Sequence, residues 1–311
     1  MNERTSAAEQ VDRDPLSLRS LGRSGLKPTA MGLGGAVLGV GGDDDQQAVD
    51  AVHAALDLGV NFFDTDPGYV GGRAEPRLGK GLKGVDRDRY ILSTKVGTPA
   101  EGPVDHSGPA VQRDVENSLR NLGVEHFDLL LIHDPKSIES FLDEGAAMDT
   151  LVDMKERGIT RAIGIGCRPH TFHRAAMDTG QCDAVLTFAD YTLLDQSAAC
   201  DTIPDAQRRG VGVILAAVLH FGALGGEEPD INRHPRAHEL WAWADRRGLS
   251  VRDLAIQYAL AMPIDGCVLI GAADRRQVAE AVNSARRDIP PQTWRELDEQ
   301  FGVGCRALSG R

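Results

Sequence analysis

The chain has 311 residues, of which 41% are hydrophobic and 26% charged, and its formal net charge is −12 at pH 7. These values are typical of a globular protein with a sizeable core, and the length allows either two medium domains or one large barrel. Because an acidic chain repels the phosphate backbone, the charge argues against non-specific nucleic-acid binding.

The cysteines and the first residues predict a cytoplasmic protein. Five cysteines are an odd number and none are spaced as C-x-x-C, which argues against a disulfide framework or a zinc cluster and indicates reduced thiols. Residues 1–14 are polar and charged, so we expect a disordered tail rather than a signal peptide. No apolar run approaches the length of a membrane span, and no membrane association is expected.

The 35 glycines cluster at the ends of apolar runs, which is typical of tight turns between strands and helices. The first expected element is a short β-hairpin that turns at residues 22–25. Hydrophobic spacing then predicts an alternation in chain order of strand 29–35, helix 46–58, strand 60–65, helix 73–82, strand 89–96, helix 109–122, strand 127–133 and helix 138–157.

The second half of the chain continues the alternation. The expected elements are strand 159–166, helix 169–179, strand 184–188, helix 195–209, strand 211–218, helices 236–247 and 251–262, strand 266–271 and helix 275–285. A last helix is expected over residues 290–301, with proline near its start. The irregular stretch 220–234 follows the seventh strand and is predicted to be a functional loop.

Eight apolar strands, each followed by at least one helix, predict an α/β protein with a closed (β/α)8 TIM barrel. Near-continuous apolar strands suit a parallel sheet that is buried on both faces. A doubly wound sheet is the alternative, but the first strand is not followed by the G-x-G-x-x-G fingerprint of a dinucleotide-binding domain. No linker divides the chain, so we expect one domain over residues 15–311, with an N-terminal hairpin and a C-terminal extra helix.

Four titratable side chains are expected at the carboxyl ends of consecutive strands, where the active sites of such barrels lie. Asp64 ends the second strand and Tyr69 follows it, Lys95 ends the third strand, and His133 ends the fourth. A lysine cation beside a tyrosine stabilises the phenolate, so Lys95 is expected to lower the pKa of Tyr69 toward neutrality. Such a tyrosine could exchange a proton with a carbonyl or hydroxyl oxygen while hydride moves at the attached carbon.

The segments that carry these residues resemble the aldo-keto reductase family, and in particular its bacterial aldose (galactose- and fucose-type) dehydrogenase branch. They are FFDTDPGY, ILSTKV and LLLIHDP, supported by AEPRLGKGL, ITRAIGIG, YTLLDQ and AAVLHFGAL. The resemblance implies an NAD(P)-dependent oxidoreductase with Tyr69 as acid/base, Lys95 and Asp64 as its tuning pair, and His133 as the orienting residue. It further implies that Tyr69, Val70 and His133 contact a small sugar or carbonyl substrate.

The same resemblance suggests where the cofactor binds and where this sequence departs from the family. The implied contacts are Gly35, Ala36, Asp64, Gly166, Cys167, Phe188, Ala216, Leu219, Gly222, Ile270, Gly271, Gln277 and Glu280. Gly166-Cys167 and Phe188 replace the usual Ser-Asn pair and Gln that hold the nicotinamide carboxamide, and Ala217 replaces the usual Tyr beneath the ring. Gly271-Ala272 and Gln277 replace the usual phosphate-binding Lys-Ser and Arg, which favours NAD over NADP unless Arg275 and Arg276 compensate.

Several alternatives remain open at this point. The best specific activity is oxidation of an aldose, and an aldehyde or ketone reductase would use the same mechanism. Lys95 could instead form a Schiff base in a lyase, with Asp64 and Tyr69 as proton carriers, or the chain could be a non-catalytic cofactor-binding subunit. Asp64, Thr65 and Asp66 could also be ordinary turn residues. The oligomeric state is left open.

Other conspicuous residues have simpler interpretations. His170 and His173 have the spacing of a helical metal pair but lack a third ligand in the sequence, so no metal site is expected. Trp241 and Trp243 are expected to pack in the protein rather than to bind substrate. Cys167 has no partner base in the sequence, so it is expected to be a small residue beside the cofactor and not a nucleophile.

Overall fold

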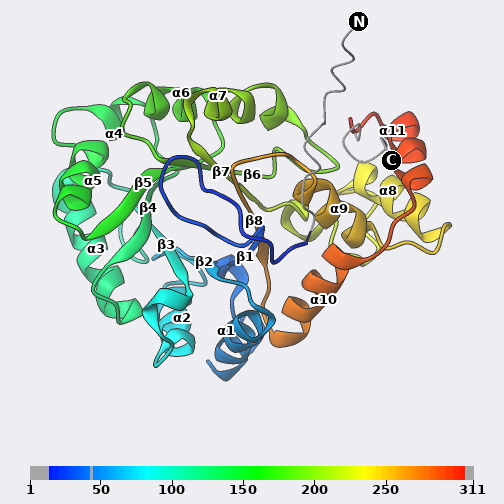
Figure 1. The fold of residues 1–311 in the computed structure, drawn as a ribbon, viewed down its shortest axis with the longest axis horizontal. Coiled ribbons are helices and arrows are strands. Elements are labelled where there is room, and N and C mark those ends of the chain that lie inside the picture. Colours follow the sequence, from blue (N-terminus) through cyan, green and yellow to red (C-terminus); the bar gives the residue numbers. More distant parts are fainter. Residues whose placement is uncertain (1–13, 43–44, 305–311) are drawn as a thin grey trace, which may run out of the picture.

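The computed structural model describes residues 14–42 and 45–304, so the predicted tail lies outside the described residues except for Asp14. Eight parallel strands pair in chain order and close into a barrel, which confirms the predicted (β/α)8 fold (Figure 1). The strands are β1 (Met31–Gly34), β2 (Phe62–Asp64), β3 (Ile91–Val96), β4 (Phe127–His133), β5 (Thr160–Gly166), β6 (Ala184–Phe188), β7 (Gly212–Ala216) and β8 (Gly266–Gly271).

Helices surround this barrel, as Figure 1 shows. Gly59 and Gly123 end two of them in the left-handed conformation, with φ of 94° and 68°. The helices are α1 (Gln46–Leu58), α2 (Ala74–Leu82), α3 (Gly108–Leu122), α4 (Glu139–Leu142), α5 (Ala147–Glu156), α6 (His170–Asp178), α7 (Thr202–Arg209), α8 (Pro235–Asp245), α9 (Val251–Leu260), α10 (Arg275–Arg286) and α11 (Pro291–Phe301). The last of them is the predicted extra helix, which packs on α8 through Phe301 and Trp243.

The apolar strands bury both of their faces, as their sequences predict. Successive side chains alternate between two clusters: Phe62 and Leu129 belong to the cluster inside the barrel, whereas Phe63 and Leu130 pack with the helices outside it. Neighbouring strands approach closely at Gly266, where a β-carbon would lie 1.7 Å from the Val213 carbonyl oxygen. Glycine is therefore required at the start of β8.

The N-terminal segment closes one end of the barrel and forms the predicted short hairpin, which turns at residues 22–25. Leu18 and Thr29 make an antiparallel bridge, and the Arg19 and Leu21 amides donate to the carbonyl oxygens of Pro28 and Leu26. Leu21 and Leu26 are buried against the interior of the barrel, and the Arg23 amide donates to the Gly210 carbonyl just before β7. In Figure 1 this dark blue segment crosses the centre of the barrel. Burial of the two leucines against the barrel stabilises a short hairpin that would be marginal on its own.

Tertiary contacts split one predicted helix. Residues 138–157 form α4 and α5, which are separated by a short loop. In that loop Gly145 has φ of 75°, and its carbonyl oxygen accepts a 3.0 Å hydrogen bond from the Gly108 amide, while Ala146 pairs with Ser107. The predicted helix 195–209 is likewise shortened, because residues 197–200 form a separate 3-10 turn before α7.

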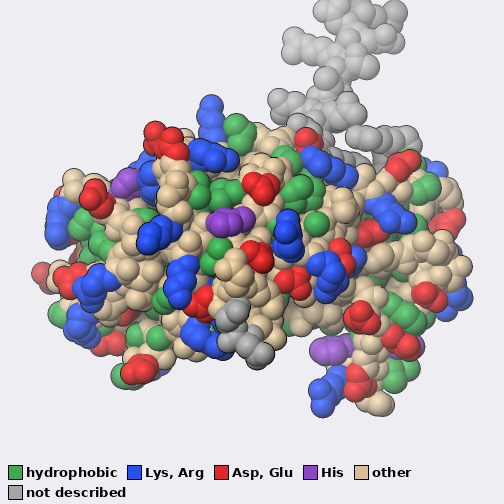
Figure 2. Space-filling view, turned by 90° about the horizontal axis from the view of Figure 1, so that it is seen from below, with side chains coloured by type: hydrophobic (Ala, Val, Ile, Leu, Met, Phe, Trp, Pro, Cys, Tyr) green, Lys and Arg blue, Asp and Glu red, His purple; other side chains and the backbone are tan. Residues whose placement is uncertain are grey.

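The surface carries charges of both signs. On the face shown in Figure 2, Lys and Arg side chains are interspersed with Asp and Glu side chains. Within residues 14–42 and 45–304, no helix combines the length and the apolarity that spanning a bilayer requires.

Candidate active site

Parallel pairing brings the four predicted catalytic residues to one rim of the barrel. Asp64 and His133 are the last residues of β2 and β4, Lys95 lies one residue before the end of β3, and Tyr69 lies on the loop that follows β2. The strand registers set Asp64 opposite Ser93 and Lys95 opposite Leu131. Consecutive strands therefore present these side chains together at their carboxyl ends.

A buried ion pair forms the base of the site. Lys95 Nζ lies 2.6 Å from Asp64 Oδ2 and also donates a 2.8 Å hydrogen bond to the Thr65 carbonyl oxygen. Ser93 Oγ donates to the other oxygen of Asp64 at 3.0 Å. Burial lowers the pKa of Lys95, but the charges of Asp64 and neighbouring acidic groups outweigh it and raise that pKa, so the ammonium stays charged.

Tyr69 lies beside this cation, with Lys95 Nζ 4.8 Å from the centre of its ring. The expected lowering of the tyrosine pKa is wrong for this structure. Burial raises the pKa of Tyr69, and the opposing charge of Lys95 does not overcome burial together with the nearby carboxylates of Asp64 and Asp66. At neutral pH Tyr69 is therefore a phenol that is competent to donate a proton.

His133 packs edge-on against Tyr69, with ring centres 5.8 Å apart and an interplanar angle of 87°. Its Nδ1 atom lies 2.7 Å from Asp66 Oδ2 and 2.7 Å from Thr98 Oγ1. The His106 ring donates to the His133 carbonyl oxygen at 2.8 Å. Sequence reasoning considered Asp66 only as a turn residue, although its place two residues after Asp64 puts it at the same rim.

Backbone strain is concentrated at the same rim. Among the described residues, six residues other than glycine have a positive φ, between 39° and 58°. Each follows the carboxyl end of a strand, namely β2, β4, β6 or β7. Such conformations cost about 1–3 kcal/mol each and cluster at functional sites. The residues are Val70, Asp134, Ala189, Ala217, His220 and Phe221.

The positions implied as cofactor contacts lie at or beside this rim. They are the ends of β1, β5, β6, β7 and β8, the loop after β7, and the N-terminal half of α10. A β-carbon at Gly35 would lie only 3.0 Å from the Asp64 carbonyl oxygen and from Thr65 Oγ1, a buried hydroxyl with no hydrogen-bond partner among the described residues. The absence of a side chain at Gly35 and the unpaired hydroxyl of Thr65 beside it fit a polar ligand that lies across the rim. Cys167 is buried, and burial raises the pKa of its thiol, which does not suit a nucleophile.

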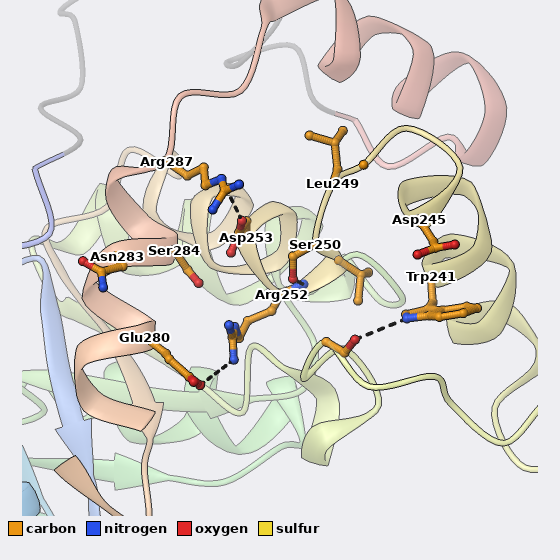
Figure 3. Close-up of a pocket in the computed structure, with 13 residues that line it drawn as sticks. Trp241, Asp245, Leu249, Ser250, Arg252, Asp253, Glu280, Asn283, Ser284 and Arg287 are labelled. Carbon is orange, nitrogen blue, oxygen red and sulfur yellow. Dashed lines mark hydrogen bonds and ion pairs between the residues drawn. The ribbon is translucent and has the colours of Figure 1, made fainter. Parts of the chain in front are cut away.

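A cavity of about 480 Å³ lies between α8, α9 and α10 (Figure 3). Glu280 extends from α10 at its edge and pairs with Arg252 at 2.8 Å and, on its other oxygen, with Arg276 at 2.7 Å. Trp241 lines the opposite wall and donates from its ring to the Gly226 carbonyl oxygen, whereas Trp243 is buried as predicted. None of the four predicted catalytic residues lines this cavity, but the implied cofactor contact Glu280 does.

Asp190, on the loop after β6, is a buried carboxyl that the sequence did not single out. One of its oxygens accepts a hydrogen bond from Thr187 Oγ1, and the other has no hydrogen-bond partner among the described residues. Burial raises the pKa of Asp190 from 3.8 to about 6. The nearby histidines of α6 are engaged elsewhere, because His170 and His173 both bond to Thr202 Oγ1.

Asp190→Asn is expected to stabilise the protein at pH 7 by up to about 3 kcal/mol. Because the folded-state pKa of Asp190 is raised, its carboxyl costs the wild type no stability below about pH 4, where it is protonated in both states. The cost of ionising it in the folded protein grows as pH rises to about 6 and is complete above that value. Urea unfolding at pH 7 and pH 4 measures the gain, which should vanish at pH 4. Asp195→Asn is the control of opposite sign, because local hydrogen bonds and Arg168 outweigh burial and lower the pKa of Asp195. An equal gain at both pH values would contradict the assignment.

A closed parallel barrel with titratable side chains at the carboxyl ends of its strands defines a barrel enzyme. The family model of the aldo/keto reductase family matches residues 30–300. The chain belongs to the aldo/keto reductase family and is an NAD(P)-dependent oxidoreductase.

Known proteins similar to this chain include two sugar dehydrogenases. L-galactose dehydrogenase of Arabidopsis thaliana is 36% identical over 285 residues, covering 86% of this chain and 87% of that protein. D-threo-aldose 1-dehydrogenase of Pseudomonas sp is 28% identical over 314 residues, covering 89% and 95%. Among solved structures, the holo form of an aldo-keto reductase from Bacillus halodurans has a TM-score of 0.75 and 25% identity, covering 92% and 96% of the two chains.

Proposed function

We propose that the protein is an aldose dehydrogenase that oxidises the lactol carbon of a small sugar to a lactone. The observation that carries this proposal is Tyr69 beside the buried Lys95–Asp64 pair, with His133 against its ring. The similarity to two sugar dehydrogenases favours a sugar over other hydroxyl compounds. A simple aldehyde or ketone reductase is the alternative with the same residues.

The proposed chemistry is a balanced hydride and proton transfer. A bound nicotinamide would supply the hydride acceptor, which takes both electrons of the C–H bond as the C–O bond becomes a carbonyl. Tyr69, as the phenolate, takes the proton of the lactol hydroxyl. His133 orients the reacting oxygen, and Val70, next to Tyr69, contacts the sugar. Because the pKa of Tyr69 is raised, oxidation needs prior loss of the phenolic proton, and its rate should rise with pH.

The nucleotide end of the cofactor is proposed to lie toward the cavity beside Glu280. There Glu280 would accept a hydrogen bond from a ribose hydroxyl, and it also forms ion pairs with Arg252 and Arg276. The negative charge of the Glu280 carboxylate disfavours a ribose 2′-phosphate at the same position, which supports a preference for NAD. The other residues implied by the resemblance stay proposed contacts.

Glu280→Gln is expected to shift the cofactor preference toward NADP by about tenfold, which corresponds to about 1.4 kcal/mol. The change removes a charge that repels phosphate and frees Arg252 and Arg276 from their ion pairs. The ratio of the two KM values, measured with the same sugar, gives the shift. Glu296→Gln is the matched control, because Glu296 lies on α11, pairs with Arg247 and does not line the cavity. An unchanged ratio in Glu280→Gln would remove Glu280 from the proposed cofactor site.

A spectrophotometric screen at the reduced-nicotinamide band tests the function. Aldoses, aldehydes and ketones are supplied with NAD⁺, NADP⁺ or their reduced forms, and aldose oxidation is the expected activity. Turnover of aldehydes and ketones without any aldose activity would favour the reductase alternative. Cofactor binding without turnover of any substrate would favour a non-catalytic subunit.

The geometry argues against a Schiff-base lyase. A Schiff base requires a neutral amine that a carbonyl carbon can reach, whereas Lys95 is a buried ammonium with two hydrogen bonds and a raised pKa. Absence of borohydride trapping on Lys95 is the expected result. We also propose that residues 15–311 act as one domain and that the enzyme works in the cytoplasm, which the five cysteines favour.

A further inference from the structure

Asp66 is a buried carboxylate whose contacts converge on His133. Asp66 is 1% exposed, and its Oδ2 atom lies 2.7 Å from His133 Nδ1 and 2.9 Å from the donating hydroxyl of Thr98. Its other oxygen accepts a 2.7 Å hydrogen bond from the Gly68 amide, within the loop that carries Tyr69. One side chain thus links the loop after β2 to the end of β4.

The contact with Asp66 determines which nitrogen of His133 carries a proton. Burial raises the pKa of Asp66, but the hydrogen bond and charge of His133 outweigh it and lower that pKa, so Asp66 is ionised at neutral pH. An ionised carboxylate only accepts hydrogen bonds, so the atom 2.7 Å away must be a donor. Nδ1 of His133 therefore bears a hydrogen, which it donates to Asp66.

We propose that Asp66 is a positioning residue that holds the Nδ1–H of His133 and so aims Nε2 at the reacting oxygen of the substrate. That this oxygen belongs to a lactol hydroxyl rests on the proposed dehydrogenase function. The hydrogen of that hydroxyl goes to Tyr69, so His133 orients the oxygen and does not take the proton.

Other charged and titratable groups around His133 do not impose the opposite arrangement. Asp134 Oδ2 lies 3.6 Å from Nε2, beyond hydrogen-bond distance, and its side chain is 48% exposed, so solvent screens it. His106 contacts the backbone carbonyl of His133 and not its ring. Lys95 is held by Asp64, and Tyr69 faces the ring of His133 edge-on.

Nitrogen NMR of the imidazole rings tests the proposal directly, because chemical shifts distinguish the two neutral forms and the doubly protonated ring. The protein is labelled with ¹⁵N-histidine, and the signals of His133 among the nine histidines are assigned by their loss in His133→Gln. The wild type is expected to show a hydrogen on Nδ1. A neutral ring with its hydrogen on Nε2 alone would overturn the proposal.

Asp66→Asn is the variant that separates positioning from packing. Asparagine has the same shape and keeps an oxygen for the Gly68 amide. Its NH2 group then takes the place of Oδ2 and donates hydrogen bonds, so Nδ1 of His133 is no longer required to carry a hydrogen. The expected results are a fall in the Nδ1–H population and a fall in kcat/KM for the sugar of about 10- to 100-fold, with cofactor Kd unchanged. An unchanged form of His133 in Asp66→Asn would also contradict the proposal. If Asp66→Asn does not fold, the wild-type measurement alone decides.

Two further variants complete the test. Glu75→Gln changes another buried carboxyl, bonded to Thr94 and Asn121 away from His133, and should alter neither the form of His133 nor turnover. Thr98→Val removes the hydroxyl that touches the same nitrogen and should leave the Nδ1–H form in place. The NMR measurement does not depend on turnover, so the spectrum decides the role of Asp66 on its own. A failure to oxidise sugars would refute the proposed function only.

Discussion

Tyr69→Phe is expected to lower kcat for the proposed oxidation by about 10²- to 10⁴-fold, the contribution usual for a positioned general acid or base. The change removes only the phenolic oxygen and leaves the ring that lies against Lys95 and His133. The fold and the binding of NAD(P) should therefore persist, since no other role is expected for that oxygen. Steady-state kinetics with the sugar found in the screen, together with cofactor titration by fluorescence, measure both effects.

Tyr90→Phe is the matched control for that experiment. Tyr90 is also buried and packs edge-on against Phe63, but it lies just before β3, at the opposite end of the barrel from Tyr69. Its variant should keep turnover within about threefold of the wild type. Full activity of Tyr69→Phe would show that another group carries the proton and would end the proposed mechanism.

Lys95→Met is expected to remove activity and to destabilise the fold by about 3–5 kcal/mol, because it leaves the Asp64 carboxylate buried without its cation. Since the pKa of Lys95 is raised, the contribution of its charge to stability is complete below the ordinary lysine value of 10.5 and declines only as pH rises through the higher folded-state value. Urea unfolding at neutral pH measures the loss of stability, and the nicotinamide assay measures the loss of turnover.

Combining Lys95→Met with Asp64→Asn should restore most of the stability without restoring turnover. The double variant no longer contains a buried unpaired charge, but Tyr69 still lacks the neighbouring cation. Lys155→Met is a control for the general cost of losing a lysine ion pair. Its side chain is 37% exposed beside Asp183, so about 1 kcal/mol or less is expected. If Lys155→Met and Lys95→Met lost the same free energy of unfolding, burial of the Lys95–Asp64 pair would not explain the predicted destabilisation.

The barrel and the four rim residues were predictable because both depend on local pattern. Apolar runs that end at glycines locate the strands, and the carboxyl ends of parallel strands necessarily meet. The contact between Asp66 and His133 joins the loop after β2 to the end of β4, so their 2.7 Å separation cannot be read from the sequence. The raised pKa of Tyr69 was missed for a similar reason, since sequence names the nearby lysine but does not measure burial.

Helix boundaries failed where distant backbone intervened. The stretch 138–157 has helical spacing throughout, yet the backbone of Gly145 and Ala146 pairs with residues just before and at the start of α3. There tertiary contact outweighs the local helical preference of the chain.

The two ends of the barrel differ in a way that bears on how the family changes its substrates. At one end the N-terminal segment seals the interior with Leu21 and Leu26, whereas the six non-glycine residues with positive φ found in the described part of the chain lie at the other end. Replacing one of these residues by glycine would relieve the strain of its positive φ, whereas most other substitutions change only the side chain presented at the rim. Sequence divergence can then proceed at the rim while the sealed end preserves the fold, which makes the protein readily evolvable.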